Sequence, residues 1–204
     1  MMPEEARLAA HICGDGCLST WIEKNSLQIV NGRRYHQKRR RYEIIYSNNE
    51  VLLLNQFSRD LKKVFGVKPR IYKDEVRTKS KRIFEHLQGL GGGGSYDWSI
   101  SKKIMGASKA IKAEWVTAFF DDEGTVDRKQ HRVRIRSMNS KGLASVRKLL
   151  KDLKINSSLT GPNADSSWWL TVSRENAVKF AKIIKSKHKT KKKLLKQLIK
   201  QRRI

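Results

Sequence analysis

The feature that most constrains the fold of this chain is a nine-residue pattern that occurs twice. Leu8–Gly16 and Val116–Gly124 are both apolar segments of helical character that end in an acidic residue followed by glycine. Self-similarity within one chain indicates that the same structural unit is built twice. The sequence therefore predicts two related halves, each opened by a helix that ends at an acid.

The segments that follow the two copies share one order: a basic strand, an asparagine-containing turn, an amphipathic helix and two further strands. The expected strands are 42–47, 67–72 and 97–101 in the first half and 132–137, 155–159 and 169–173 in the second, with helices at 51–65, 143–153 and 176–187. A closing helix is evident only in the second half. We expect an α+β fold of two pseudo-symmetric αββαββα halves, packed through the paired motif helices.

The first half carries an additional stretch, 73–95, with a short helix around Ile83 and Leu87 and then four consecutive glycines, Gly91–Gly94. Such a glycine run predicts a flexible loop or an introduced linker, because glycine loses the most conformational entropy on ordering. We expect a first half at 1–103, a second half at 104–188 and a basic tail helix at 189–204.

Charge indicates the class of partner. The 204 residues include 45 Lys plus Arg and 19 Asp plus Glu, for a net charge of +26, while 38% hydrophobic residues are enough to build a core. This balance points to a polyanion and excludes wholesale disorder. No apolar run is long enough for a membrane span, and the acidic start is unlike a secretory signal, so we expect an intracellular protein without a membrane partner. Cys13 and Cys17 alone cannot supply a disulfide framework.

The acids of the repeat are the candidate chemical groups. Asp15 and Glu123 each precede the final glycine, at a helix end where the dipole and the free carbonyls disfavour negative charge. Two such acids form an oxygen-rich site that suits Mg²⁺. Both can reach one site only if the helices lie side by side, and the small residues Ala6, Ala10 and Gly14 on one helical stripe permit that approach.

The paired motifs and the twice-used element order resemble the monomeric LAGLIDADG homing endonucleases over essentially the whole chain. The resemblance implies a saddle of antiparallel sheets on double-stranded DNA, a monomer, and Mg²⁺-dependent cleavage of both strands at a long site, by an intron-encoded or freestanding enzyme. Carried over, the catalytic and metal-binding acids are Asp15 and Glu123, with the carbonyls of Gly14 and Asp122 as further ligands.

Two positions depart from the family pattern. His11 stands where an aliphatic residue is usual, and Asp122 stands where a small residue faces the partner helix. Asp122 is therefore an alternative to Glu123 as the second metal ligand. The alternative functions are an RNA intron maturase, a relative that binds nucleic acid without cutting it, and a ribosomal-type basic protein.

Basic residues supply the expected DNA contacts. Arg132, Arg134 and Arg136 alternate with β-branched residues and so share one strand face, where arginine can read guanine. The remaining expected contacts cluster near a hairpin tip at Gly32 or follow the second motif: Arg33, Arg34, Lys38, Arg40 and Lys129. Ser47 and Asn48 are candidates for ordering water. The tail, which includes Lys191, Arg202 and Arg203, is expected to dock on the core and touch phosphates.

Overall fold

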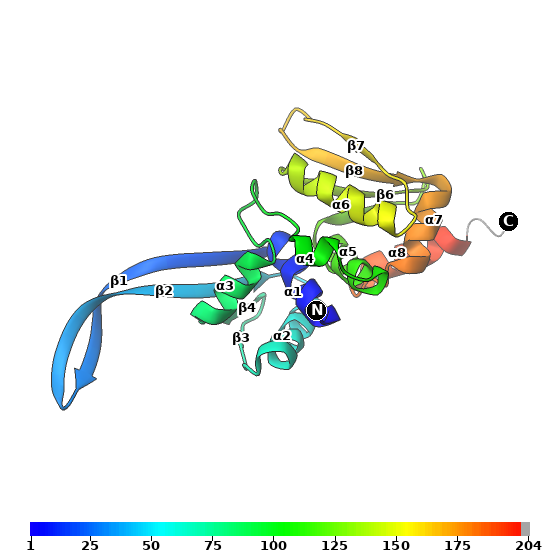
Figure 1. Cartoon of the computed structure of the whole chain (residues 1–204). Helices are drawn as coiled ribbons and strands as arrows, with labels where there is room; N and C mark the ends of the chain where they lie inside the picture. The colour runs from blue at the N-terminus through cyan, green and yellow to red at the C-terminus, as the bar shows by residue number, and fades with distance from the viewer. Residues whose placement is uncertain (201–204) are drawn as a thin grey trace.

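The computed structural model describes residues 1–200 and contains two halves of the same topology, each with the element order αββαββα (Figure 1). The first half comprises α1 (Pro3–Cys13), β1 (Gly16–Val30), β2 (Arg33–Ser47), α2 (Val51–Phe65), β3 (Arg70–Ile71), β4 (Glu75–Thr78) and α3 (Lys81–Gly89). The second comprises α5 (Lys109–Glu123), β5 (Gly124–Asp127), β6 (Arg132–Ser137), α6 (Ser140–Asp152), β7 (Ser158–Thr160), β8 (Trp168–Ser173) and α7 (Arg174–Ile183). The predicted α+β fold is confirmed.

Two further helices lie outside this repeat. α4 (Lys102–Met105) connects the halves, so the expected boundary at 103/104 falls inside it, and α8 (Lys189–Lys200) follows the second half. The last four residues of the expected tail, among them Arg202 and Arg203, lie outside the described residues. Among the described helices, none is long and apolar enough to cross a bilayer.

Each half contains one four-stranded sheet in which every pairing is antiparallel. The strand orders are β1-β2-β4-β3 and β5-β6-β8-β7, so the two sheets have equivalent topology. In the second sheet Val133 and Ile135 are fully buried, as the alternation in β6 predicts, which leaves the arginines of that strand on the opposite face.

The motif helices α1 and α5 pack against each other at the centre of the molecule (Figure 1). Ala6, Ala9 and Ala10 are completely buried there, and Ala118 of α5 is almost completely buried. These residues belong to one apolar cluster with the core of the second half, whereas Leu8 and Ile12 of α1 face the core of the first half. Because its small-residue stripe packs closely against α5, α1 contributes buried residues to the cores of both halves.

The expected fourth strand of the first half, 97–101, is wrong. That place in the sheet is taken by β4, and the segment 97–101 is a loop. The ring of Trp98 is buried 4.8 Å from the ring centroid of Phe119 and 6.3 Å from that of Trp115 in α5. The apolar residues of this segment therefore pack at the junction between the halves, and α3 is the closing helix that the sequence seemed to lack.

The glycine run forms a packed turn, so the expectation of a flexible loop is also wrong. Gly91 is buried at φ +114°, and its carbonyl accepts a hydrogen bond of 2.9 Å from the Ser99 amide. A Cβ at Gly91 would lie 1.9 Å from the Ser99 carbonyl oxygen. Gly91 is required because its backbone lies against that of Ser99 and leaves no room for a side chain.

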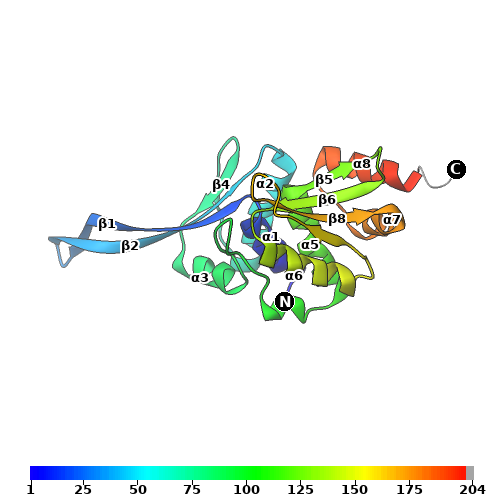
Figure 2. The ribbon, with the colours of Figure 1, turned by 90° about the horizontal axis from the view of Figure 1, so that it is seen from above.

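The β1–β2 hairpin is the main difference between the halves. Its two strands have 15 residues each, whereas β5 and β6 have 4 and 6. The hairpin extends far beyond the body of the protein (Figures 1 and 2). The strand expected at 42–47 is only its inner end, because the outer part has no second layer to cover it and therefore lacks an apolar pattern.

Candidate active site at the ends of the motif helices

The two motif helices end side by side. A Cβ placed on Gly14 would lie 2.7 Å from Asp122 Oδ2, so the chain after α1 lies directly against the last turn of α5. A pocket opens at this point, lined by Asp15, Ser47, Asn48, Asn49, Glu50, Asp74, Asp121, Asp122, His188 and Lys191. Asp15 lines this pocket and Glu123 does not, but the carboxyl group of Glu123 interacts electrostatically with that of Asp15, so the two helix ends bring both acids to one region.

Burial and mutual repulsion make both carboxyl groups hard to ionise. Burial first, and then the charge of Asp122, raise the pKa of Asp15 to about 6. Burial, followed by the charges of Asp15 and Asp122, raises the pKa of Glu123 to about 7. Asn48 Nδ2 donates a 2.8 Å hydrogen bond to Asp15 Oδ2, and the Ser47 amide donates to the Asp15 carbonyl. Burial and crowding of carboxylates both disfavour the ionised form, and a proton or a bound cation would relieve both effects.

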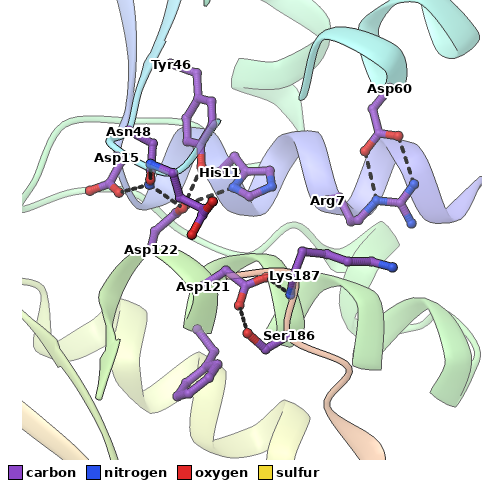
Figure 3. A network of polar contacts seen from close by, with 12 residues as sticks. Arg7, His11, Asp15, Tyr46, Asn48, Asp60, Asp121, Asp122, Ser186 and Lys187 are labelled. Carbon is purple, nitrogen blue, oxygen red and sulfur yellow. Dashed lines mark hydrogen bonds and ion pairs between the residues drawn. The ribbon is translucent and has the colours of Figure 1, made fainter. Parts of the chain in front are cut away.

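Asp122 lies at the centre of the polar network in Figure 3. Its side chain is completely buried; Oδ2 lies 2.9 Å from His11 Nδ1, and Oδ1 accepts a 2.7 Å hydrogen bond from the Tyr46 hydroxyl. Burial lowers the pKa of His11, but the charge and hydrogen bond of Asp122 act together with the charges of Asp121 and Asp60, and the net pKa is raised. The two departures from the repeated motif therefore form one buried ion pair that joins the two halves.

Asp121, one position earlier, binds the chain that leads into α8. Its carboxylate accepts hydrogen bonds from the Ser186 hydroxyl and, at 2.8 Å, from the Lys187 amide. In the first half the equivalent residue is Cys13, whose thiol lies 3.7 Å from the Gly91 carbonyl and 3.8 Å from the Ser99 carbonyl. In both halves this position holds the end of the motif helix to the segment beyond the closing helix.

Lys191 is a site residue that the sequence assigned only to phosphate contact. Its ammonium group donates to the carbonyls of Asp121 at 2.6 Å, Asp122 at 3.0 Å and Phe120 at 3.3 Å. Burial lowers its pKa. Lys191, Leu195 and Leu198 have i, i+4, i+7 spacing, and this spacing was the signal that Lys191 lies on the docked face of α8.

The arginines of β6 form a surface next to this site. The guanidinium groups of Arg134 and Arg136 lie 5.1 Å and 5.7 Å from the ring centroid of Trp169, and Arg136 also pairs with Asp165. Arg132 pairs with Asp127 at 3.2 Å. These contacts hold the arginine side chains in place on one face of β6.

The other expected basic contacts lie away from the pocket. Arg33, Arg34, Lys38 and Arg40 are exposed on the outer part of the β1–β2 hairpin, and Lys129 is exposed in the β5–β6 turn. Within residues 1–200 no group of three or more His, Cys, Asp or Glu side chains could hold a metal ion. A cation bound by Asp15 and Glu123 would therefore take its remaining ligands from carbonyl oxygens or water.

Comparisons with known proteins bear on the fold. Residues 110–185 match the LAGLIDADG-like domain family, and no curated protein matches the chain. Among solved structures, the complex of I-DmoI with DNA and Ca is 20% identical, with a TM-score of 0.65 and coverage of 91% of both chains. The complex of I-DmoI with DNA and Mn is 19% identical, with a TM-score of 0.64 and coverage of 91% of this chain and 98% of that one.

Full-length DUF199/WhiA from Thermatoga maritima shares the fold more distantly. It is 14% identical, with a TM-score of 0.59, and the match covers 100% of this chain and 62% of that one. At these identities the solved structures establish the common fold and nothing further about chemistry.

Proposed function

We propose that this chain, whose residues 110–185 form a LAGLIDADG-like domain and which has the fold of the homing endonuclease I-DmoI, is itself a site-specific DNA endonuclease. The reaction is hydrolysis of a phosphodiester in each strand of a long duplex, with a divalent cation. One observation carries the proposal: the paired motif helices end side by side, and there the carboxyl groups of Asp15 and Glu123, one from each half, interact electrostatically and both have raised pKa values.

The donor set at these helix ends fits a hard divalent cation such as Mg²⁺. Asp15 and Glu123 supply carboxylate oxygens, and the carbonyls of Gly14 and Asp122 are the additional protein ligands we assign. The Asp122 carboxylate is already bonded to His11 and Tyr46, so Glu123 is the second acid of choice. The Asp122 carbonyl is shared with Lys191. When bound, the cation would supply Lewis-acid activation of the phosphodiester and of the attacking water.

The surrounding residues orient this chemistry. Asn48 holds Asp15 through a 2.8 Å hydrogen bond, and we assign the ordering of water to Asn48 and Ser47, both of which line the pocket. The charge of Arg136 acts on Glu123, and we assign to this arginine the neutralisation of a phosphate next to the site.

Duplex DNA is the proposed partner, bound by a monomer. The hairpin arginines and lysines would follow the duplex on one side of the site, and Arg132, Arg134, Arg136 and Lys129 would contact it on the other. Support comes from the net charge of +26 and from the two basic sheets. The long hairpin and the short β5–β6 pair imply a target whose two half-sites differ in extent.

A cleavage assay on a library of long duplexes tests this proposal. We expect sequence-specific double-strand cleavage with Mg²⁺ and none with EDTA, and we expect Asp15→Asn and Glu123→Gln to abolish it. Glu85→Gln neutralises an exposed carboxylate on α3 and should leave cleavage intact. Tight duplex binding without cleavage under any cation would show a DNA-binding protein instead, and selective binding of intron RNA with no duplex cleavage would favour the maturase alternative.

A further inference from the structure

Helix α8 bridges the two halves at the wall of the pocket. The Lys189 amide at its start donates a 3.2 Å hydrogen bond to Glu50, the residue that caps α2 in the first half. Leu195 and Leu198 are buried against the second half. The helix is therefore fixed relative to both sides of the site, and it is not a free basic tail.

This docking delivers one charged group into the pocket. Lys191 Nζ contacts the carbonyls of the last turn of α5, with the shortest distances to Asp121 and Asp122, and it lies 5.7 Å from the ring centroid of Phe120. Carbonyls at a helix C-terminus lack intrahelical partners and carry the negative end of the helix dipole. An ammonium group satisfies them in the way that a bound cation would.

We propose that Lys191 is a built-in cation of the active site, which holds the carbonyl end of α5 and sets how tightly the site binds a divalent cation. The inference rests on the proposed function, since it assigns a role next to Asp15 and Glu123. The Lys191 ammonium interacts electrostatically with both of these carboxylates. It opposes a second cation by charge repulsion, and it shares the Asp122 carbonyl that such a cation would use.

The proposal separates Lys191 from the other lysines of α8. Lys193 has the same charge on the same helix, but its side chain is exposed. If α8 were merely a clamp on phosphates, the two lysines would be equivalent in every assay. If Lys191 is a component of the site, only its removal changes the affinity for cations.

Calorimetric titration of the full chain with Mn²⁺ is the test. Lys191→Met and Lys191→Gln should bind Mn²⁺ about tenfold more tightly than the unaltered protein, whereas Lys193→Met should match it. Lys191→Gln retains a hydrogen-bond donor for the carbonyls, so it tests the inference even if the Met variant misfolds. Thermal melting shows whether each variant is folded. Lys191→Arg, which keeps the charge, should retain the original affinity. Equal or weaker Mn²⁺ binding by the two neutral Lys191 variants would overturn the inference.

Cleavage assays distinguish this inference from the proposed function. In an active enzyme Lys191→Met should lower the Mg²⁺ concentration for half-maximal cleavage by about the same tenfold factor, an effect that general destabilisation would not produce. A protein that never cleaves but whose Lys191 variants bind Mn²⁺ more tightly would refute the nuclease and keep the inference. Mg²⁺-dependent cleavage combined with unchanged Mn²⁺ affinity in the variants would support the nuclease and overturn the inference about Lys191.

Discussion

At the residue scale, the His11–Asp122 pair shows how two unusual side chains can be explained by each other. Each would be unfavourable alone at the interface of the motif helices, since one is a buried imidazole and the other a buried carboxylate. Together they form a 2.9 Å ion pair, to which the Tyr46 hydroxyl adds a hydrogen bond. Each residue departs from the pattern of its own motif, but neither motif taken separately shows that the two side chains are partners.

The pair should therefore behave as a unit on mutation. We expect His11→Leu to lower the free energy of unfolding by about 3–5 kcal/mol, because it leaves the Asp122 carboxylate buried without its cation. His11→Leu combined with Asp122→Ala should be more stable than the sum of the two single losses, by about 2 kcal/mol. Urea unfolding of the four proteins measures this coupling, and additive effects would contradict it.

Glu123 provides a pH prediction for the protein without bound cation. Its raised pKa, about 7 in the folded state, means that folding favours the protonated form. This contribution to stability is present at acidic pH and is lost as pH rises through 7, because the folded protein must then hold a carboxylate beside Asp15 and Asp122. The free energy of unfolding of Glu123→Gln, relative to the unaltered protein, should therefore be higher at pH 8 than at pH 5. The expected difference is about 1–2 kcal/mol after allowance for solvent screening.

Unfolding of the two proteins in EDTA at both pH values measures that difference. Glu85→Gln, on an exposed helix face, should show no such pH-dependent gain. A stability difference between Glu123→Gln and the unaltered protein that is the same at pH 5 and pH 8 would show that Glu123 titrates normally.

At the element scale, the close packing of α1 against α5 requires a residue without a side chain at Gly14. Gly14→Ala would place a methyl group 2.7 Å from Asp122 Oδ2, and we expect it to lower stability by about 1–3 kcal/mol. Gly89→Ala at the end of α3 is the matched control, since its added methyl meets nothing within 4 Å. Chemical denaturation should show a loss for the first variant only, and equal effects would argue against close packing at Gly14.

The β6 strand and the β1–β2 hairpin should contribute differently to DNA binding. Arg134 is held over Trp169, so Arg134→Ala should relax base preference at one position and weaken binding to the preferred site by about 1–3 kcal/mol. Arg34→Ala, on the exposed hairpin, should weaken binding to all DNA sequences alike. It should also reduce the slope of affinity against salt concentration by the amount expected for about one phosphate contact. Binding to a panel of single-position target variants at several salt concentrations separates the two effects.

At the scale of the whole molecule, the core of the second half extends across the interface and includes residues of the first half. Trp115 of α5 is completely buried in the cluster that also contains Ala6 and Ala10 of the first half. We expect Trp115→Ala to lower the free energy of unfolding by about 3–5 kcal/mol and to destabilise both halves together. Coincident loss of helical circular dichroism and of tryptophan fluorescence in one transition supports this, whereas two separate transitions would show independent halves.

The successes and failures of sequence-based prediction have physical causes. Local periodicity predicts α2, α6, β6 and β8, because each buries one face against its own half. Residues 97–101 also have a strand-like pattern, but Trp98 buries its ring against the other half. Gly91–Gly94 look flexible by composition, but Gly91 packs against the backbone of Ser99, a contact that the glycines themselves do not reveal.

The sequence by itself determined the repeat, the acids at the ends of the two motif helices and the basic surface. Each of these follows from local pattern, spacing and charge. Tertiary structure alone decided that His11 pairs with Asp122, that Lys191 reaches the end of α5 and that the hairpin stands free of the body. These contacts join residues far apart in the chain. Which distant groups meet depends on how helices and sheets pack, and packing is a property of the assembled molecule that no local pattern contains.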